Sequence, residues 1–267
     1  MLQAPQRTAV SGPALIRVLA RLTDLDVPES SQSLSDRLSQ WLGWTDAIGL
    51  STALNGHSRG GHPRGGPPRA GAPRDDHPPA VAAGVQAGGH AEEAECARLR
   101  TSLAKAIVGD STFAAARRRG SAQAPAQNAS ADTAVDYAVF RQRYLSIQQT
   151  METTIGDLRG RLRAMLATRT PAMARLAVVD AVMERALSPR EHNLLATVPG
   201  MLAGHFERLR AAERETLAAA EAAGDVAGGR SGAWLDVFRK DMQSVLLAEL
   251  ELRFQPVEGL LAALLTR

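Results

Sequence analysis

Hydrophobic side chains recur every three or four positions along most of this chain, which is the spacing of one face of a helix. The longest stripe advances in steps of 3, 4, 3, 4, 4, 3, 4 and 3 residues. Its members are Tyr137, Phe140, Tyr144, Ile147, Met151, Ile155, Leu158, Leu162 and Met165. This pattern predicts one long helix of about thirty residues, with a coiled-coil-like stripe that shifts its register near Met151.

Three shorter helices are predicted near the N-terminus. In SGPALIRVLARL, Ser11 is placed to cap a helix and Pro13 occupies an early position where its missing N–H has no partner. Two more helices are expected in SLSDRLSQWLGWTDAIGLSTAL, with Gly43 between them. We therefore expect residues 1–54 to form a small N-terminal helical unit.

A further helix is expected over residues 91–109, in AEEAECARLRTSLAKAIVG. Glu92, Glu93 and Glu95 would lie in its first turns and the basic residues later, an order that complements the helix dipole. Gly109 is a plausible stop signal.

The C-terminal part, residues 133–267, predicts a long-helix bundle. After the long stripe, Thr170-Pro171 should begin a new helix, and SPRE at 188–191 has the form of a capping box that would begin another. Pro199-Gly200 predicts a break or kink. Pro256 should bend or restart the last helix.

Two segments lack any hydrophobic period. Residues 55–90 contain HSRGGHPRGGPPRAGAPRDDHPPA, in which proline and glycine prevent a regular frame, and residues 110–132 are small and polar. The histidines His57, His62 and His77 are farther apart than the ligand pairs of structural zinc sites. We expect a disordered linker over 55–90 and a flexible segment over 110–132.

The composition supports an all-α fold. Hydrophobic residues make up 45% of the 267 positions and aromatic residues 4%, and β-branched residues nowhere alternate as strands require. The prediction is a helical bundle with long amphipathic helices and a disordered Pro/Gly/Arg/His-rich linker, without a β-sheet. No stretch is apolar enough to span a bilayer, so we expect no membrane span and a cytoplasmic protein.

The excess of basic residues is local. The formal net charge is +3, yet residues 1–54 carry four basic and five acidic side chains and residues 132–267 carry seventeen of each. The surplus therefore lies in the two unpatterned segments. Arg117, Arg118 and Arg119 are the candidate anion or nucleic-acid patch, and a nucleic-acid-binding protein is the alternative function. No aromatic residue is interleaved with these arginines, which disfavours nucleic acid as a partner.

The motifs of common enzyme and metal sites are missing from the sequence. It has no GxGxxG, GxxxxGK[ST], HExxH or GxSxG, and its one cysteine, Cys96, has no histidine base near it in sequence other than His90. His192 and His205 are the best metal candidates, but they lack the Glu-x-x-His step of metal-binding bundles. We therefore assign no catalytic, cofactor-binding or metal residue and expect a non-enzymatic protein that needs no cofactor.

Two stretches carry a resemblance to a known family. WLGWTDAIGL near the front and FRKDMQSVLLAELELRFQPVEGLLAAL at the end resemble an uncharacterised bacterial family known only as a domain of unknown function. Its members are often encoded near proton-channel-type membrane proteins and a peptidoglycan-binding envelope protein. The resemblance implies association with a membrane or cell-envelope complex and assigns no site residues.

The long stripe has two interpretations. Packing in an intramolecular core is the default, but the helix could extend past its bundle and pair with a partner or a second copy. On that hypothesis, the partner or dimer face comprises Tyr137, Phe140, Tyr144, Ile147 and Met151. The expected function is a helical scaffold or adaptor that acts through coiled-coil-like protein–protein contacts.

Overall fold

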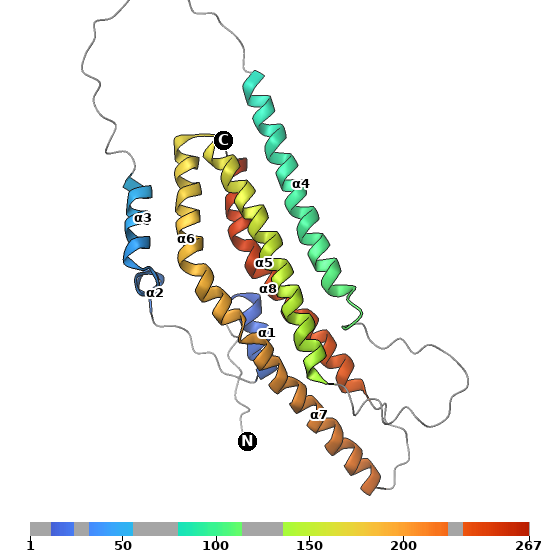
Figure 1. Ribbon diagram of the computed structural model, residues 1–267. Helices are drawn as coiled ribbons and strands as arrows, with labels where there is room; N and C mark the ends of the chain where they lie inside the picture. Colours follow the sequence, from blue (N-terminus) through green and yellow to red (C-terminus); the bar gives the residue numbers. More distant parts are fainter. Residues whose placement is uncertain (1–11, 24–31, 56–79, 114–135, 224–231, 267) are drawn as a thin grey trace, which may run out of the picture. The chain divides into compact units, whose positions relative to one another are not determined.

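A computed structural model of the chain describes residues 12–23, 32–55, 80–113, 136–223 and 232–266 (Figure 1). All regular structure in these ranges is helical and none of it is strand, which confirms the all-α prediction. The helices are α1 (Ala14–Thr23), α2 (Leu34–Trp41), α3 (Trp44–Asn55), α4 (Ala80–Val108), α5 (Tyr137–Ala167), α6 (Pro171–Leu195), α7 (Val198–Ala222) and α8 (Ala233–Leu265).

Several predicted helix boundaries are confirmed. Gly43 separates α2 from α3, and α4 ends directly before Gly109. At the start of α2, Ser33 Oγ accepts a hydrogen bond of 3.1 Å from the Asp36 amide. At the start of α6, Thr170 Oγ1 accepts one of 3.2 Å from the Met173 amide. Side-chain oxygens thus satisfy amides of the first turn at both helix starts. The cap predicted at Ser11 lies outside the described residues.

The helical restart predicted at SPRE is wrong. α6 runs without interruption from Pro171 to Leu195 and contains Pro189 in its interior. Asp180 and Glu184 pair with α5 before the proline, and Glu191 pairs with α8 after it. We attribute the continuity to these contacts, because packing outweighs the local preference for a cap.

Two segment boundaries also differ from expectation. α4 begins at Ala80, eleven residues before the predicted start, so Glu92, Glu93 and Glu95 lie within the helix and not in its first turns. The predicted flexible segment 110–132 begins with buried residues, since Asp110 and Phe113 are both covered. The rest of that segment from residue 114, and residues 56–79 of the predicted linker, lie outside the described residues.

The chain forms two compact units, and each is built from three separate stretches of sequence. Unit 1 comprises residues 1–31, 99–156 and 191–255, and unit 2 comprises residues 32–98, 157–190 and 256–267. α1 therefore belongs to a different unit from α2 and α3, although the sequence places all three in the predicted unit 1–54. Contacts distant in sequence decide this division.

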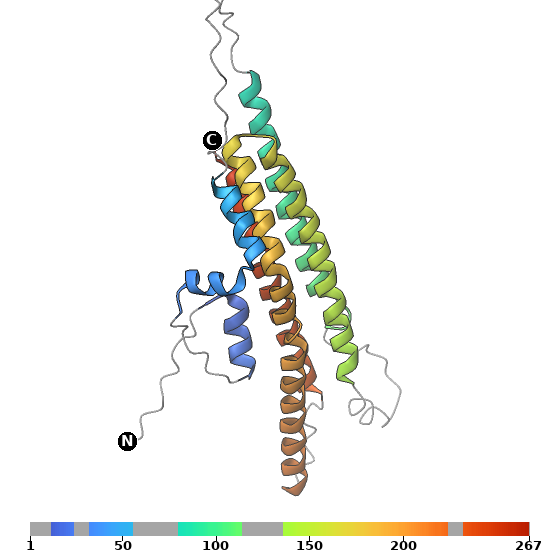
Figure 2. The same ribbon diagram turned by 60° about the vertical axis from the view of Figure 1, so that its left-hand side comes forward.

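In unit 1, α1 packs on α7 and an aromatic cluster fills the core. Arg208 Nη2 on α7 donates to the Leu22 carbonyl at 2.5 Å, beside the buried leucines of α1. The turned view shows α1 as a separate short helix (Figure 2). Phe206 and Phe238 have ring centroids 5.0 Å apart at a steep angle, the edge-to-face arrangement that aromatic pairs prefer.

In unit 2, contacts far apart in sequence hold α3, α4, α5, α6 and α8 together. Arg161 Nη2 on α5 lies 2.7 Å from Glu95 Oε1 on α4. Arg169, just after α5, donates through Nη1 to the Leu264 carbonyl of α8 at 2.7 Å. Arg185 Nε on α6 lies 3.5 Å from Asp46 Oδ1 on α3. Each of these five helices is thus tied to another by at least one polar contact.

Candidate functional site

The predicted partner face on α5 is buried. Phe140, Tyr144, Ile147 and Met151 are covered by their own unit, and Tyr144 and Met151 expose no surface at all. Tyr137 is half-buried and donates its hydroxyl hydrogen bond to the Pro199 carbonyl. The other four residues of the predicted partner or dimer face therefore offer almost no surface to a partner. Their burial favours the core interpretation of the stripe.

A buried polar layer lies across unit 1, centred on Glu249 of α8. Its carboxylate accepts hydrogen bonds from Tyr144 Oη at 2.7 Å, from Gln148 Nε2 at 3.0 Å and from Arg253 Nε at 2.9 Å. Gln148 Nε2 also donates to the Leu195 carbonyl at 3.2 Å. A buried carboxylate is tolerated because several donors and one positive charge compensate for its lost hydration.

The tyrosines of unit 1 are held in their neutral form. Burial raises the pKa of Tyr144 well above its ordinary value, and the adjacent Glu249 carboxylate adds to the effect. Burial likewise raises the pKa of Tyr137 to about 12. Both phenols remain hydrogen-bond donors at neutral pH. This arrangement is typical of a structural hydrogen-bond network, and neither phenol readily gives up its proton at neutral pH.

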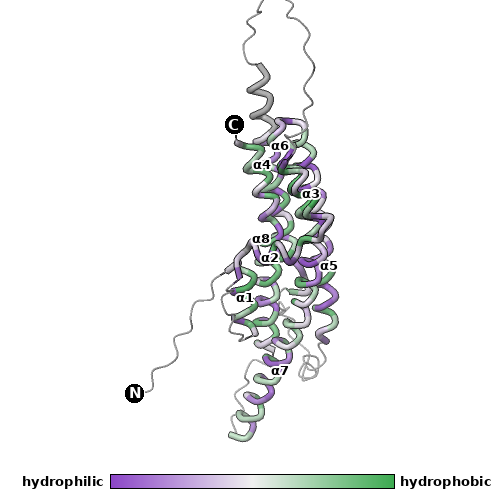
Figure 3. Tube along the Cα trace, turned by 90° about the vertical axis from the view of Figure 1, so that its left-hand side faces the viewer, coloured by the Kyte–Doolittle hydropathy of each residue, from purple (hydrophilic) through white to green (hydrophobic). Residues whose placement is uncertain are grey.

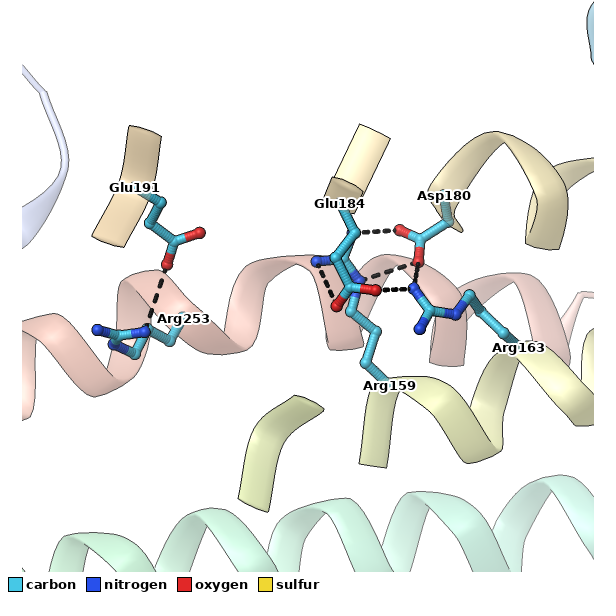
Figure 4. A network of polar contacts seen from close by, with 6 residues as sticks. All are labelled: Arg159, Arg163, Asp180, Glu184, Glu191 and Arg253. Atoms are coloured by element: carbon cyan, nitrogen blue, oxygen red, sulfur yellow. Dashed lines mark hydrogen bonds and ion pairs between the residues drawn. The ribbon is translucent and has the colours of Figure 1, made fainter. Parts of the chain in front are cut away.

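A second polar cluster joins α5 to α6 in unit 2 (Figure 4). Arg159 meets Asp180 through two hydrogen bonds, of 2.6 Å from Nη2 and 2.9 Å from Nε. Arg163 Nη1 lies 3.2 Å from Asp180 Oδ2 and also contacts Glu184. We call these four residues the arginine clamp. In this clamp two positive guanidinium groups face two negative carboxylates, which is typical of a structural contact between helices.

The remaining candidates from the sequence do not assemble into a site. Cys96 is buried, and burial raises the pKa of its thiol, with Glu92 and Glu95 adding to the effect. His192 Nδ1 lies 3.5 Å from Glu152 Oε2, whereas His205 Nε2 lies 2.9 Å from Asp241 Oδ2, so the two histidines have different partners. Across the described ranges, no three His, Cys, Asp or Glu side chains gather as metal ligands would. Arg117, Arg118 and Arg119 lie outside those ranges.

The outward face of α3 is the surface that the sequence interpretation missed. Trp44 is 82% exposed, Ile48 is 50% exposed and Leu54 is 61% exposed. Ala47 and Ser51, also exposed, lie between them on the same side of the helix. We call these five residues the α3 outer face. Large apolar side chains in solvent are informative when several share one helical face.

The opposite side of α3 is already occupied by α6. A methyl group at Gly49 would lie 3.6 Å from Val182, Asp46 pairs with Arg185, and Ala53 is buried. α3 is therefore apolar on both sides but covered on only one. The signal was present in the sequence, because WTDAIGLSTAL has hydrophobic residues around its whole circumference, as helices buried on all sides do.

Bands of hydrophobic and hydrophilic residues alternate along the helices in Figure 3. Within the parts of the chain that the structure describes, no helix has an apolar stretch long enough to cross a bilayer.

No curated protein and no solved structure matches the chain. The family described as "Protein of unknown function (DUF3348)" matches over residues 1–266, nearly the entire sequence, and the chain belongs to this family.

Proposed function

We propose that this protein is a non-enzymatic helical adaptor that binds a partner protein through the α3 outer face. The observation that carries the proposal is the exposure of Trp44, Ile48 and Leu54 on a helix whose other side is anchored to α6. Tryptophan is among the residues most enriched as anchors of protein interfaces.

The proposed partner is an amphipathic helix. Ala47 and Ser51 are small and separate the larger side chains, so a second helix could approach α3 closely between them. The outer face carries no charged residue, and therefore an apolar stripe of a partner would meet no unpaired charge there. Three helical turns offer less than the roughly 800 Å² per partner of a standard interface, so we expect a reversible complex.

The family resemblance adds a proposal about location. It implies a bacterial protein whose partner belongs to a membrane or cell-envelope complex, and the sequence adds the expectation that the protein itself is cytoplasmic. The search for partners should therefore use both the soluble fraction and a detergent-solubilised envelope fraction.

The test is capture of partners by the tagged chain and by two matched variants. Ile48→Glu places a charge on the α3 outer face, whereas Val178→Glu places the same charge on α6 at a side chain that is also 50% exposed. We expect Ile48→Glu to lose a partner that wild type and Val178→Glu both retain. That partner, once purified, should bind wild type and not Ile48→Glu.

Two results would contradict the proposal. If Ile48→Glu and Val178→Glu capture the same proteins as wild type, the α3 outer face does not bind them. If light scattering shows that wild type is a dimer and Ile48→Glu a monomer, the face binds a second copy instead of a different protein. Circular dichroism should show unchanged helicity for both variants, since exposed substitutions usually change stability by within about 0.5 kcal/mol.

A further inference from the structure

α2 and α3 bury very little surface for their length. Among the side chains of these two helices that the structure describes, Ala53 alone is buried. α1 is a single helix of 10 residues, yet it buries Leu15, Leu19, Ala20 and Leu22. Burial of apolar surface is the main force that holds a helix against its neighbours. Hydrophobic packing therefore holds α2 and α3 much more weakly than it holds α1.

Two arginines of α6 contact α2 and α3 inside unit 2. The guanidinium carbon of Arg190 lies over the Trp41 ring of α2, 5.2 Å from its centroid, which is a cation–π contact. Arg185 Nε lies 3.5 Å from Asp46 Oδ1 of α3, and the Arg185 side chain is 67% exposed. Ion pairs of such exposed groups contribute little to stability, and salt weakens them.

An apolar contact between α3 and α6 lies beside the ion pair. A methyl group built on Gly49 would lie 3.6 Å from Val182 Cγ2, so the α3 backbone passes close to the Val182 side chain. Val182 is buried, as is Ala53 one turn beyond Gly49. Detachment of α3 from α6 would expose apolar surface on both helices. The attached position is therefore favoured, but only by a small apolar area.

α2 and α3 are joined closely enough to move together. Only Leu42 and Gly43 separate the two helices. The Leu42 amide donates to the Leu38 carbonyl at 2.8 Å, and the Ala47 amide donates to the Gly43 carbonyl at 2.9 Å. Backbone hydrogen bonds thus reach the junction from both sides, so displacement of one helix displaces the other.

We infer that α2 and α3, residues 34–55, form a latch that detaches from α6 as one piece. Arg185 and Arg190 hold this latch closed. In the open state neither helix is packed against a neighbour. Helices of 8 and 12 residues are marginally stable in water without such packing, so the amides of the open latch lose their protection from exchange.

Hydrogen exchange of the full chain, resolved to short peptides, tests the latch in the wild-type protein. We expect hydrogen-bonded amides of residues 34–55 to exchange at least about tenfold faster than those of α1. Because salt screens the pair of Arg185 and Asp46, exchange in the latch should rise further between about 0.05 and about 0.5 M sodium chloride. Amides of residues 242–250 in α8 should show no such rise. Equal protection of the latch and α1, or exchange in the latch that does not change with salt, would overturn the inference.

Two single variants test whether the latch opens as one piece. Arg185→Gln removes a contact to α3, whereas Arg190→Gln removes a contact to α2. We expect each variant to speed exchange about threefold or more in both helices. Acceleration confined to the helix that lost its contact would mean that α2 and α3 detach separately. That result, or no acceleration at all, would refute the latch.

A double-mutant cycle ties the effect of Arg185 to its pair with Asp46. Asp46→Asn removes the carboxylate of the pair, so Arg185→Gln should speed exchange less in the Asp46→Asn background than in wild type. The rise of exchange with salt should also be smaller in both single variants. If the effects of Asp46→Asn and Arg185→Gln are simply additive, the ion pair does not hold the latch closed and the inference fails.

The latch regulates the α3 outer face, a consequence that rests on the proposed function. A partner binds α3 only while this helix is ordered, so time spent in the open state lowers its apparent affinity. Arg185→Gln should therefore bind the partner more weakly than wild type. Gly49→Ala adds a methyl group in ordinary contact with Val182, so it should slow exchange in the latch and bind the partner more tightly.

The two readouts separate failure of the latch from failure of the proposed function. If wild type and Ile48→Glu capture the same proteins, the proposed function fails, and the exchange measurements still decide whether the latch exists. If Arg185→Gln and Gly49→Ala change exchange but leave the affinity for a captured partner unchanged, the latch does not regulate the α3 outer face.

Discussion

Tyr144 Oη donates a hydrogen bond of 2.7 Å to Glu249 Oε2, and neither side chain has any exposed surface. The two residues are 105 positions apart in the chain, and their contact joins α5 to α8. A buried carboxylate paired with a neutral phenol makes the stability of unit 1 sensitive to alkaline pH. The first prediction follows from this relationship.

We expect both tyrosines to resist ionisation in the folded protein. Tyr137 and Tyr144 are the only tyrosines of the chain, and the pKa of each is raised by burial, that of Tyr137 to about 12. Between pH 10 and these raised values, the unfolded chain loses phenolic protons that the folded chain keeps. Stability is therefore unaffected by the tyrosines below pH 10 and falls as the pH rises above it. Absorbance of tyrosinate during an alkaline titration should appear together with loss of helical circular dichroism.

The Tyr144→Phe variant provides the control for this titration. It removes one phenol and one buried hydrogen bond, so we expect about 1 kcal/mol less stability at pH 7. Its stability should fall less steeply above pH 10 than that of wild type. Tyrosinate absorbance that rises at pH 10 while the protein remains folded would contradict the raised pKa values.

The apolar stripe of α5 should behave as core when it is truncated. Met151 is fully buried in unit 1, so Met151→Ala should cost about 2–5 kcal/mol of unfolding free energy in urea. Val139 lies on the same helix and is 59% exposed, so Val139→Ala should cost much less. Similar losses for the two variants would argue against a core role for the stripe.

The arginine clamp should contribute measurably to stability. Asp180→Ala removes the carboxylate that accepts hydrogen bonds from both Arg159 and Arg163. Because these guanidinium groups are largely covered, we expect a loss of about 1–3 kcal/mol in denaturant unfolding. Glu215→Ala removes an exposed carboxylate of α7 and should change stability little. The clamp would be energetically minor if both variants unfold at the same urea concentration.

Cys96 should react slowly with thiol reagents while the protein is folded. It is the single cysteine, it is buried, and its thiol pKa is raised, so little thiolate is available at neutral pH. Labelling at pH 7 should become fast only in denaturant. A labelling rate in buffer equal to that of the unfolded chain would show that the thiol is accessible.

Local patterns in the sequence were sufficient for much of the secondary structure. The 3–4 spacing from Tyr137 to Met165 predicts α5, and Gly43 and Gly109 mark where helices end. These features depend on side chains within one or two turns of each other, which a sequence shows directly. The SPRE motif failed as a boundary because its local capping preference competes with packing on both sides of Pro189.

The α3 outer face shows the limit of the same approach. The sequence reveals that the segment from Trp44 to Leu54 is apolar around its circumference, but not which side is covered. That depends on Val182 and Arg185, more than 130 residues away, which occupy the side of Gly49 and Asp46. Because α6 covers that side of α3, Trp44 and Ile48 on the opposite side remain exposed to solvent.

By itself, the sequence determined the all-α class, several helix boundaries and the amphipathic stripe of α5. The tertiary structure alone decided that this stripe is core, that α1 and α3 belong to different units, and that Glu249 is buried among Tyr144, Gln148 and Arg253. The physical reason is how far apart along the chain the interacting residues lie. Helix formation is governed by neighbours a few residues apart, whereas burial and charge pairing depend on which distant segments pack together.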